Sequence, residues 1–148
     1  MNKKLISVLF TFALLSGIGY AAAKTVPMRG YGSGIITSAT PGPTGVAITA
    51  TGGGEATHLG KFTREEEILL NPENFTFTGT VVFTAADGSE LNCSFAGGFT
   101  GATTAAGTYT FTGGTGRFAN ATGGAYFSVS QSDPQNFTFE FAGTIEMN

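Results

Sequence analysis

Only one histidine, His58, is present in the chain, and this limits the catalytic chemistry that the sequence can support. Catalytic triads use histidine as their base, and zinc sites often use it as a repeated ligand. We therefore expect no triad and no metal site. His58 has the same alternation phase as Ala56 and Phe62, which leaves two roles open. It could be a lone acid, base or ligand contact inside a cavity, or it could make a structural hydrogen bond.

Three further side chains have chemistry that could serve a binding site. Cys93 has apolar residues two positions away on both sides, which predicts a buried, unreactive thiol, because a reactive thiol needs a cationic neighbour. Arg117 belongs to a glycine-rich turn, where it could cap the turn or receive an anion at a rim. Tyr109 lies on the apolar face of an alternating segment. With the histidine, these three residues are the predicted ligand contacts.

The glycine-rich segment around Arg117 formally fits a dinucleotide-binding fingerprint, because Gly114, Gly116 and Ala119 have the required spacing. That chemistry needs a helix directly after the motif, since the helix N-terminus binds the pyrophosphate. Residues 119–124 read Ala-Asn-Ala-Thr-Gly-Gly, which is not typical of a helix. The sequence therefore predicts a tight turn with glycines at positive φ, and no cofactor.

Composition and charge exclude several classes of protein. One cysteine cannot form a disulfide scaffold, and 14 phenylalanines are not typical of a disordered chain. The formal net charge of −3 lacks the basic excess that binding to a phosphate backbone requires. Nucleic acid is therefore not an expected partner.

The first 23 residues have the pattern of a secretory signal. Lysines at positions 3 and 4 precede an apolar run over 5–18, and alanines at 21–23 supply the small residues of a cleavage site. The run is shorter than the roughly 20 residues that cross a bilayer. We expect cleavage after Ala23, export to the periplasm or the cell exterior, and a single mature domain over 24–148 with no membrane span.

An alternation of period two dominates the mature chain. Over 75–85, nearly every odd position is apolar or glycine and nearly every even one is threonine, which places the two sets on opposite faces of a strand. Similar segments predict about eight strands, near 28–37, 45–51, 56–63, 75–85, 91–99, 109–112, 127–130 and 137–145. For 63–70 a capping-box pattern leaves a short helix as the alternative to a further strand.

The edges of these strands decide between a β-sandwich and a barrel. Strands rich in threonine and glycine offer few charges to prevent association at open edges, whereas closure removes the edges. We therefore expect an all-β fold, an eight-stranded antiparallel β-barrel, whose interior is filled by side chains or holds one small ligand.

Residues 113–123, Gly-Gly-Thr-Gly-Arg-Phe-Ala-Asn-Ala-Thr-Gly, resemble a turn of plant dirigent proteins and of the related allene oxide cyclases. The segment 56–63 is similar to a segment of exported bacterial proteins of unknown function that carry the same turn. The resemblance implies an eight-stranded antiparallel barrel with a hydrophobic cavity, in which the turn joins two late strands. The carboxylates that line the cavity in those families cannot be matched to positions here.

The carboxylates of the chain do not predict a catalytic pair. Two of them, Glu90 and Glu140, fall on the threonine face and are expected to meet solvent. No two groups can be assigned to face each other inside the barrel from the set Glu55, Glu65, Glu66, Glu67, Glu90 and Glu140.

Three functions stay open. The first is an exported barrel without enzymatic activity, monomeric or homo-oligomeric, that binds a small hydrophobic molecule or serves as a structural module outside the cytoplasm. The second is a cyclase or isomerase in which one carboxylate steers an apolar substrate. The third is a small outer-membrane barrel, with its apolar face outward.

Overall fold

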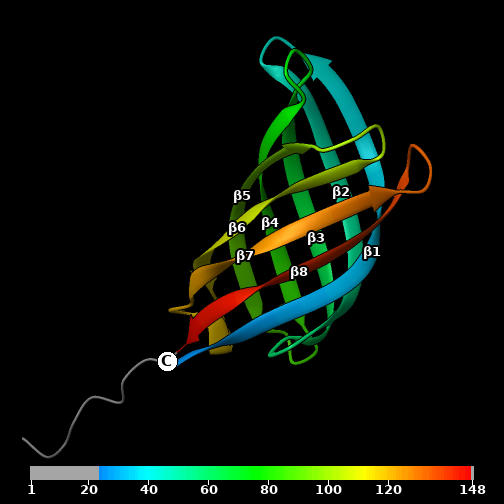
Figure 1. The fold of residues 1–148 in the computed structure, drawn as a ribbon. Coiled ribbons are helices and arrows are strands. Elements are labelled where there is room, and N and C mark those ends of the chain that lie inside the picture. The colour runs from blue at the N-terminus through cyan, green and yellow to red at the C-terminus, as the bar shows by residue number, and fades with distance from the viewer. Residues whose placement is uncertain (1–23, 148) are drawn as a thin grey trace, which may run out of the picture.

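Eight antiparallel strands form a closed barrel in the computed structural model, which describes residues 24–147 (Figure 1). The predicted export segment, 1–23, lies outside the described residues. The strands are β1 (Lys24–Gly42), β2 (Gly45–Ala56), β3 (Gly60–Asn71), β4 (Thr76–Ala85), β5 (Glu90–Phe99), β6 (Thr104–Gly114), β7 (Thr122–Gln131) and β8 (Asn136–Met147), with a short 3₁₀ helix η1 (Gly116–Phe118) before β7.

Each strand pairs with its neighbour in sequence, and β1 closes the barrel by pairing with β8 from Lys24 opposite Met147 to Ile35 opposite Asn136. The up-and-down order divides the connections between two ends. We call the end with the turns at 43–44, 72–75, 100–103 and 132–135 the upper end. The lower end has the connections at 57–59, 86–89 and 115–121, together with the start of β1 and the end of β8 (Figure 1). Within residues 24–147, no helix is long and apolar enough to cross a bilayer.

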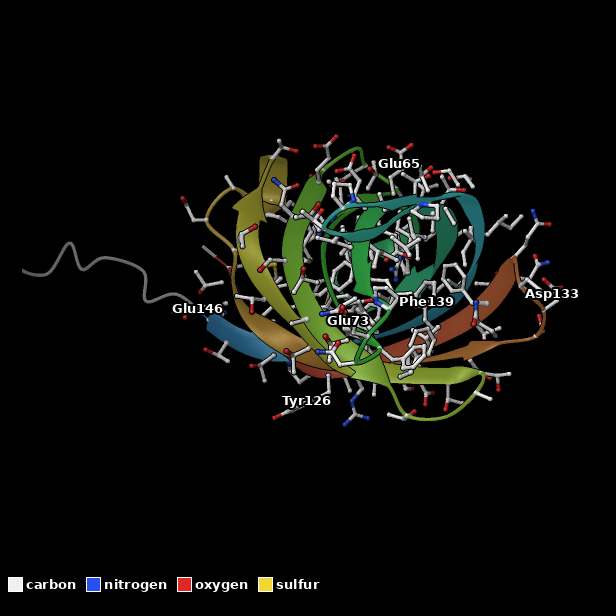
Figure 2. The ribbon with its side chains drawn as sticks, turned by 90° about the horizontal axis from the view of Figure 1, so that it is seen from above. Glu65, Glu73, Tyr126, Asp133, Phe139 and Glu146 are labelled. Atoms are coloured by element: carbon white, nitrogen blue, oxygen red, sulfur yellow. The ribbon has the colours of Figure 1, made fainter. Side chains whose placement is uncertain are left out.

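The alternation that the sequence predicts separates the barrel interior from its outer wall. Nine of the twelve phenylalanines after residue 23 are buried, whereas threonine, serine and glutamate occupy most outward positions. Phe139 lies within the ring of strands, and Glu65 and Tyr126 project from its outer side (Figure 2). The apolar outer face on which the outer-membrane alternative was based is therefore not present in residues 24–147.

Three local expectations need correction. The strand predicted over 56–63 is interrupted by a turn at 57–59, because His58 adopts a left-handed conformation with φ 65°. The helix alternative for 63–70 is wrong, since these residues belong to β3. Phe75 is not a strand residue: it lies in the β3–β4 turn with φ 58° and is exposed. The positive φ values of Gly113 and Gly116 confirm the predicted turn.

Six inward phenylalanine rings each lie over a glycine directly opposite in the adjacent strand. A Cβ atom added at any of these glycines would stand 2.4 to 2.9 Å from the ring's Cζ atom, closer than van der Waals contact permits. The pairs are Gly30 with Phe141, Gly32 with Phe139, Gly34 with Phe137, Gly79 with Phe95, Gly97 with Phe77, and Gly107 with Phe127. Glycine at these positions therefore makes the space that the rings fill.

The lower end is closed by side chains that have almost no solvent exposure. Phe118 of η1 and Leu59 of the β2–β3 turn are 0% and 2% exposed, and they pack in the same core as Met28, Leu91 and Ile145. The glycine-rich turn thus supplies the buried Phe118 side chain, which helps to close the lower end of the barrel.

The ring–glycine pairing predicts that Gly30→Ala destabilises the barrel, because the added methyl group would meet Phe141 Cζ at 2.4 Å and Ala56 Cβ at 2.7 Å. We expect the free energy of unfolding to fall by about 1–3 kcal/mol in urea titrations. Gly42→Ala, at the other end of the same strand, is the control, since its nearest neighbour would be Gly45 O at 3.6 Å. Equal stabilities of the two variants would contradict the pairing.

Candidate functional site

A cavity of about 130 Å³ occupies the upper half of the barrel. Phe77, Phe99 and Gln131 line it near the upper turns, and Tyr109 and Phe95 line it deeper inside. Aliphatic side chains form much of the remaining wall, namely Ile36, Ile48, Ile68, Leu70 and Val129. Because side chains close the lower end, the cavity lies between this closed end and the upper turns.

Two charged residues of β3, Arg64 and Glu66, line this apolar cavity. They stand two positions apart on one strand, so the pleat turns both side chains to the interior, in phase with Phe62 and Ile68. The guanidinium Nη2 of Arg64 donates a hydrogen bond to Glu66 Oε2, and its Nη1 donates to the Tyr109 hydroxyl at 3.0 Å. We call Arg64, Glu66 and Tyr109 the polar cluster.

Aromatic faces surround the buried guanidinium. The Cζ atom of Arg64 lies 4.3 Å from the ring centre of Phe139 and 5.3 Å from that of Phe83, both within range of a cation–π interaction. Burial opposes the charge of Arg64, but Tyr109 and Glu66 outweigh this effect and raise its pKa. The polar cluster therefore holds a cation and an anion in contact, with no net charge.

The polar cluster also has unused hydrogen-bonding capacity. Nε of Arg64 is buried without a hydrogen-bond partner. Within residues 24–147, Oε2 is the only oxygen of Glu66 with a hydrogen-bond donor, which leaves Oε1 without a protein donor. Because Glu66 lines the cavity, Oε1 is available to a donor group on a bound molecule.

Cys93 and Tyr109 are both buried, and burial raises the pKa of each side chain. Burial raises the pKa of Tyr109 to about 12, although the nearby Arg64 charge opposes the shift. Burial likewise raises the pKa of the Cys93 thiol, and Arg64 offsets only part of the effect. The cationic neighbour that a reactive thiol needs is thus present but insufficient, and Cys93 stays protonated at neutral pH.

His58 and Arg117 lie at the lower end, opposite the mouth of the cavity. His58 is exposed, and its backbone carbonyl accepts a hydrogen bond of 2.6 Å from Arg117 Nη1. Nε of Arg117 donates to Asp87 Oδ2 at 2.8 Å, and its Cζ atom lies 4.9 Å from the ring centre of Phe118. The hydrogen bond from Arg117, with that from the Ser89 backbone, lowers the pKa of Asp87 to about 2. Arg117 therefore joins three lower loops.

Of the four predicted ligand contacts, the structure places Tyr109 on the cavity wall and Cys93 in the core near it. Arg64 and Glu66 are the cavity residues that sequence analysis missed. A charged side chain by itself favours an exposed position, and the capping-box pattern left a short helix open for this segment. The alternation of β3 could have identified Arg64 and Glu66. Phe62, Ile68 and Leu70 share one face of the strand, and the two charged residues lie between them on that face.

No protein-family model and no curated protein sequence matches this chain. Among solved structures, that of a pterocarpan synthase dirigent protein is similar, with a TM-score of 0.63 and 14% sequence identity. The match covers 89% of this chain and 95% of the dirigent protein. The chain is therefore a dirigent-like β-barrel with an aromatic-lined interior, as the turn at 113–123 implied.

The raised pKa of Tyr109 predicts that the barrel loses stability at high pH. Between pH 10 and about 12 the phenol ionises in the unfolded chain but stays protonated in the folded barrel. The folded state then binds more protons, so the free energy of unfolding falls as the pH rises, by on the order of 2–3 kcal/mol from this residue. Urea titrations across this range measure the fall.

Tyr109→Phe should show a smaller fall than the wild type, whereas the exposed control Tyr126→Phe should keep it. An unchanged pH profile in Tyr109→Phe would show that this phenol is not the group responsible.

Proposed function

We propose that this chain is an exported barrel that binds a small, uncharged, largely apolar molecule in the cavity above the polar cluster. The observation that carries the proposal is a cavity in the upper half of the barrel with mostly apolar walls and the polar cluster at its base. Such a combination of apolar walls and few polar groups is typical of ligand sites.

The size of the cavity limits the ligand. Cavities of roughly 150 Å³ hold a benzene molecule, whereas sites for drug-sized ligands measure about 300–1,000 Å³. A cavity of about 130 Å³ therefore fits a single six-membered ring or an aliphatic group of similar volume.

The charge state of the polar cluster limits the ligand further. Arg64 and Glu66 already neutralise each other, so an ionic ligand would lose its hydration without gaining a free counter-ion. A neutral ligand avoids this cost, and a single hydroxyl or amine proton on it could be donated to Glu66 Oε1. We therefore expect neutral rings to bind and their carboxylate analogues to be rejected.

An enzymatic function is the second candidate, because the same polar cluster brings a carboxylate, a cation and a phenol to the cavity wall. In a cyclase or isomerase, Glu66 would steer a reactive apolar substrate while Arg64 and Tyr109 hold the carboxylate in place. The similar solved structure belongs to a protein described as a synthase. Chemical analysis of the ligand after incubation with the protein distinguishes the two functions. A binding protein leaves the ligand unchanged, whereas an enzyme converts it.

Ligand binding is tested by isothermal titration calorimetry with toluene, benzyl alcohol and benzoate. We expect both neutral compounds to bind, benzyl alcohol more tightly because it can donate to Glu66, and benzoate to show no binding. Ala105→Leu places extra carbon atoms in the cavity and should weaken binding roughly tenfold or more.

The matched control is Ala96→Leu on the outer wall of β5, which should bind as the wild type does. Undiminished binding to Ala105→Leu would place the site elsewhere. Failure of all three compounds to bind would leave the structural-module function as the better description.

Export is tested by the mass of the mature protein. The lysine-led apolar segment and Ala21–Ala23 support cleavage after Ala23. When the full chain is expressed in a bacterial host, we expect it in the periplasmic or extracellular fraction with Lys24 at its N-terminus. Recovery of the full-length chain from the cytoplasm would contradict export.

A further inference from the structure

The outer wall carries a second group of side chains that the cavity does not use. Two of its most exposed large side chains, Tyr31 of β1 and Tyr126 of β7, are 61% and 76% exposed and lie on either side of β8. Across β1, β8 and β7, one row of paired residues consists of Tyr31, Glu140 and Ser128. The next outward row consists of Arg29, Ala142 and Tyr126. We call these six outward residues the tyrosine face.

The strand register fixes the geometry of the tyrosine face. The two tyrosines are two strands and two residues apart, which corresponds to about 12 Å between their Cα atoms. The small side chain of Ala142 lies between them, and a depression in the outer wall is lined by Arg29, Tyr31, Tyr126, Ser128, Glu140 and Ala142 among others. Figure 2 shows Tyr126 projecting outward from this side of the barrel.

Several polar groups of the tyrosine face have free hydrogen-bonding capacity. Glu140 Oε1 accepts a hydrogen bond from Ser128 at 3.3 Å, and within residues 24–147 its other oxygen has no donor. In the same part of the chain, neither the Arg29 guanidinium nor the Tyr126 hydroxyl has a hydrogen-bond or ion-pair partner. The Tyr31 hydroxyl donates to Glu55 Oε2 at 3.2 Å, which orients that ring.

We propose that the tyrosine face binds a neutral oligosaccharide. Sugar rings present C–H groups that pack on exposed aromatic rings, and adjacent hydroxyls that pair with a carboxylate and a guanidinium. The separation of the two tyrosines suits a segment of about two sugar rings, one against each tyrosine. Glu55 and Glu140 together outnumber Arg29, so the local charge disfavours acidic sugars.

The chemistry of the face favours a sugar over a protein partner. The fully buried centre of a stable protein interface is more apolar than the rest of the surface and is depleted of charged residues. Here the two rings are separated by Glu140 and Ala142. This inference does not rest on the cavity or on its ligand.

The proposal is tested by NMR titration of the mature domain with cellotetraose, chitotetraose and mannotetraose, with tetragalacturonate as the acidic control. At least one neutral tetrasaccharide should shift the amide signals of residues 29–31, 126–128 and 140–142, and tetragalacturonate should not. Tyr126→Ala should weaken binding roughly tenfold or more, whereas Tyr126→Phe should retain most of it.

Two control variants test whether sugar binding is confined to the tyrosine face. Ile35→Ala removes another exposed side chain of β1 outside the tyrosine face, and Ala105→Leu fills the cavity; both should bind as the wild type does. The proposal is overturned if no neutral tetrasaccharide binds or if Tyr126→Ala binds normally. It is also overturned if sedimentation shows that Tyr126→Ala dissociates a dimer, because the face would then be an interface between copies.

Discussion

The packing of phenylalanine rings against glycines in adjacent strands is the constraint on which the rest of the barrel depends. Neighbouring strands are only about 4.8 Å apart, so a ring that leans across the next strand occupies the place of its side chain. Only glycine leaves that place empty. Glycine usually weakens a strand, but at these positions it is necessary because the ring needs the space. The pairs occur between β1 and β8, β4 and β5, and β6 and β7, so the same device recurs around the wall.

This aromatic packing also explains where the polar cluster and the cavity lie. Rings fill the middle of the barrel, and the faces of Phe83 and Phe139 hold the Arg64 guanidinium that water would otherwise solvate. Toward the upper end, aliphatic side chains such as Ile48 and Leu70 share the wall with Phe77 and Phe99, and the side chains do not fill the interior completely. The cavity therefore lies above the densely packed middle of the barrel, with a neutral ion pair at its base.

The fold could be predicted from the sequence because its main signal is local. Alternation marked most strands, and the glycines of 113–116 marked the late turn. The turn at His58 was missed because a left-handed conformation at a non-glycine residue has no clear local signal. Arg64 and Glu66 were missed because each charge by itself favours solvent. Only their contacts with each other and with Tyr109 make burial tolerable, and the contact with Tyr109 joins β3 to β6, which are far apart in the chain.

Arg117 contacts the carbonyl of His58 and the carboxylate of Asp87, which lie 59 and 30 positions earlier in the sequence. These partners come together only after the strands from β2 to β6 have assembled in register. Because contacts between residues so far apart require the closure of long loops, we expect the arginine to act late in folding, when the base of the barrel is complete. We therefore expect its contacts to slow the unfolding of the barrel more than they speed its folding.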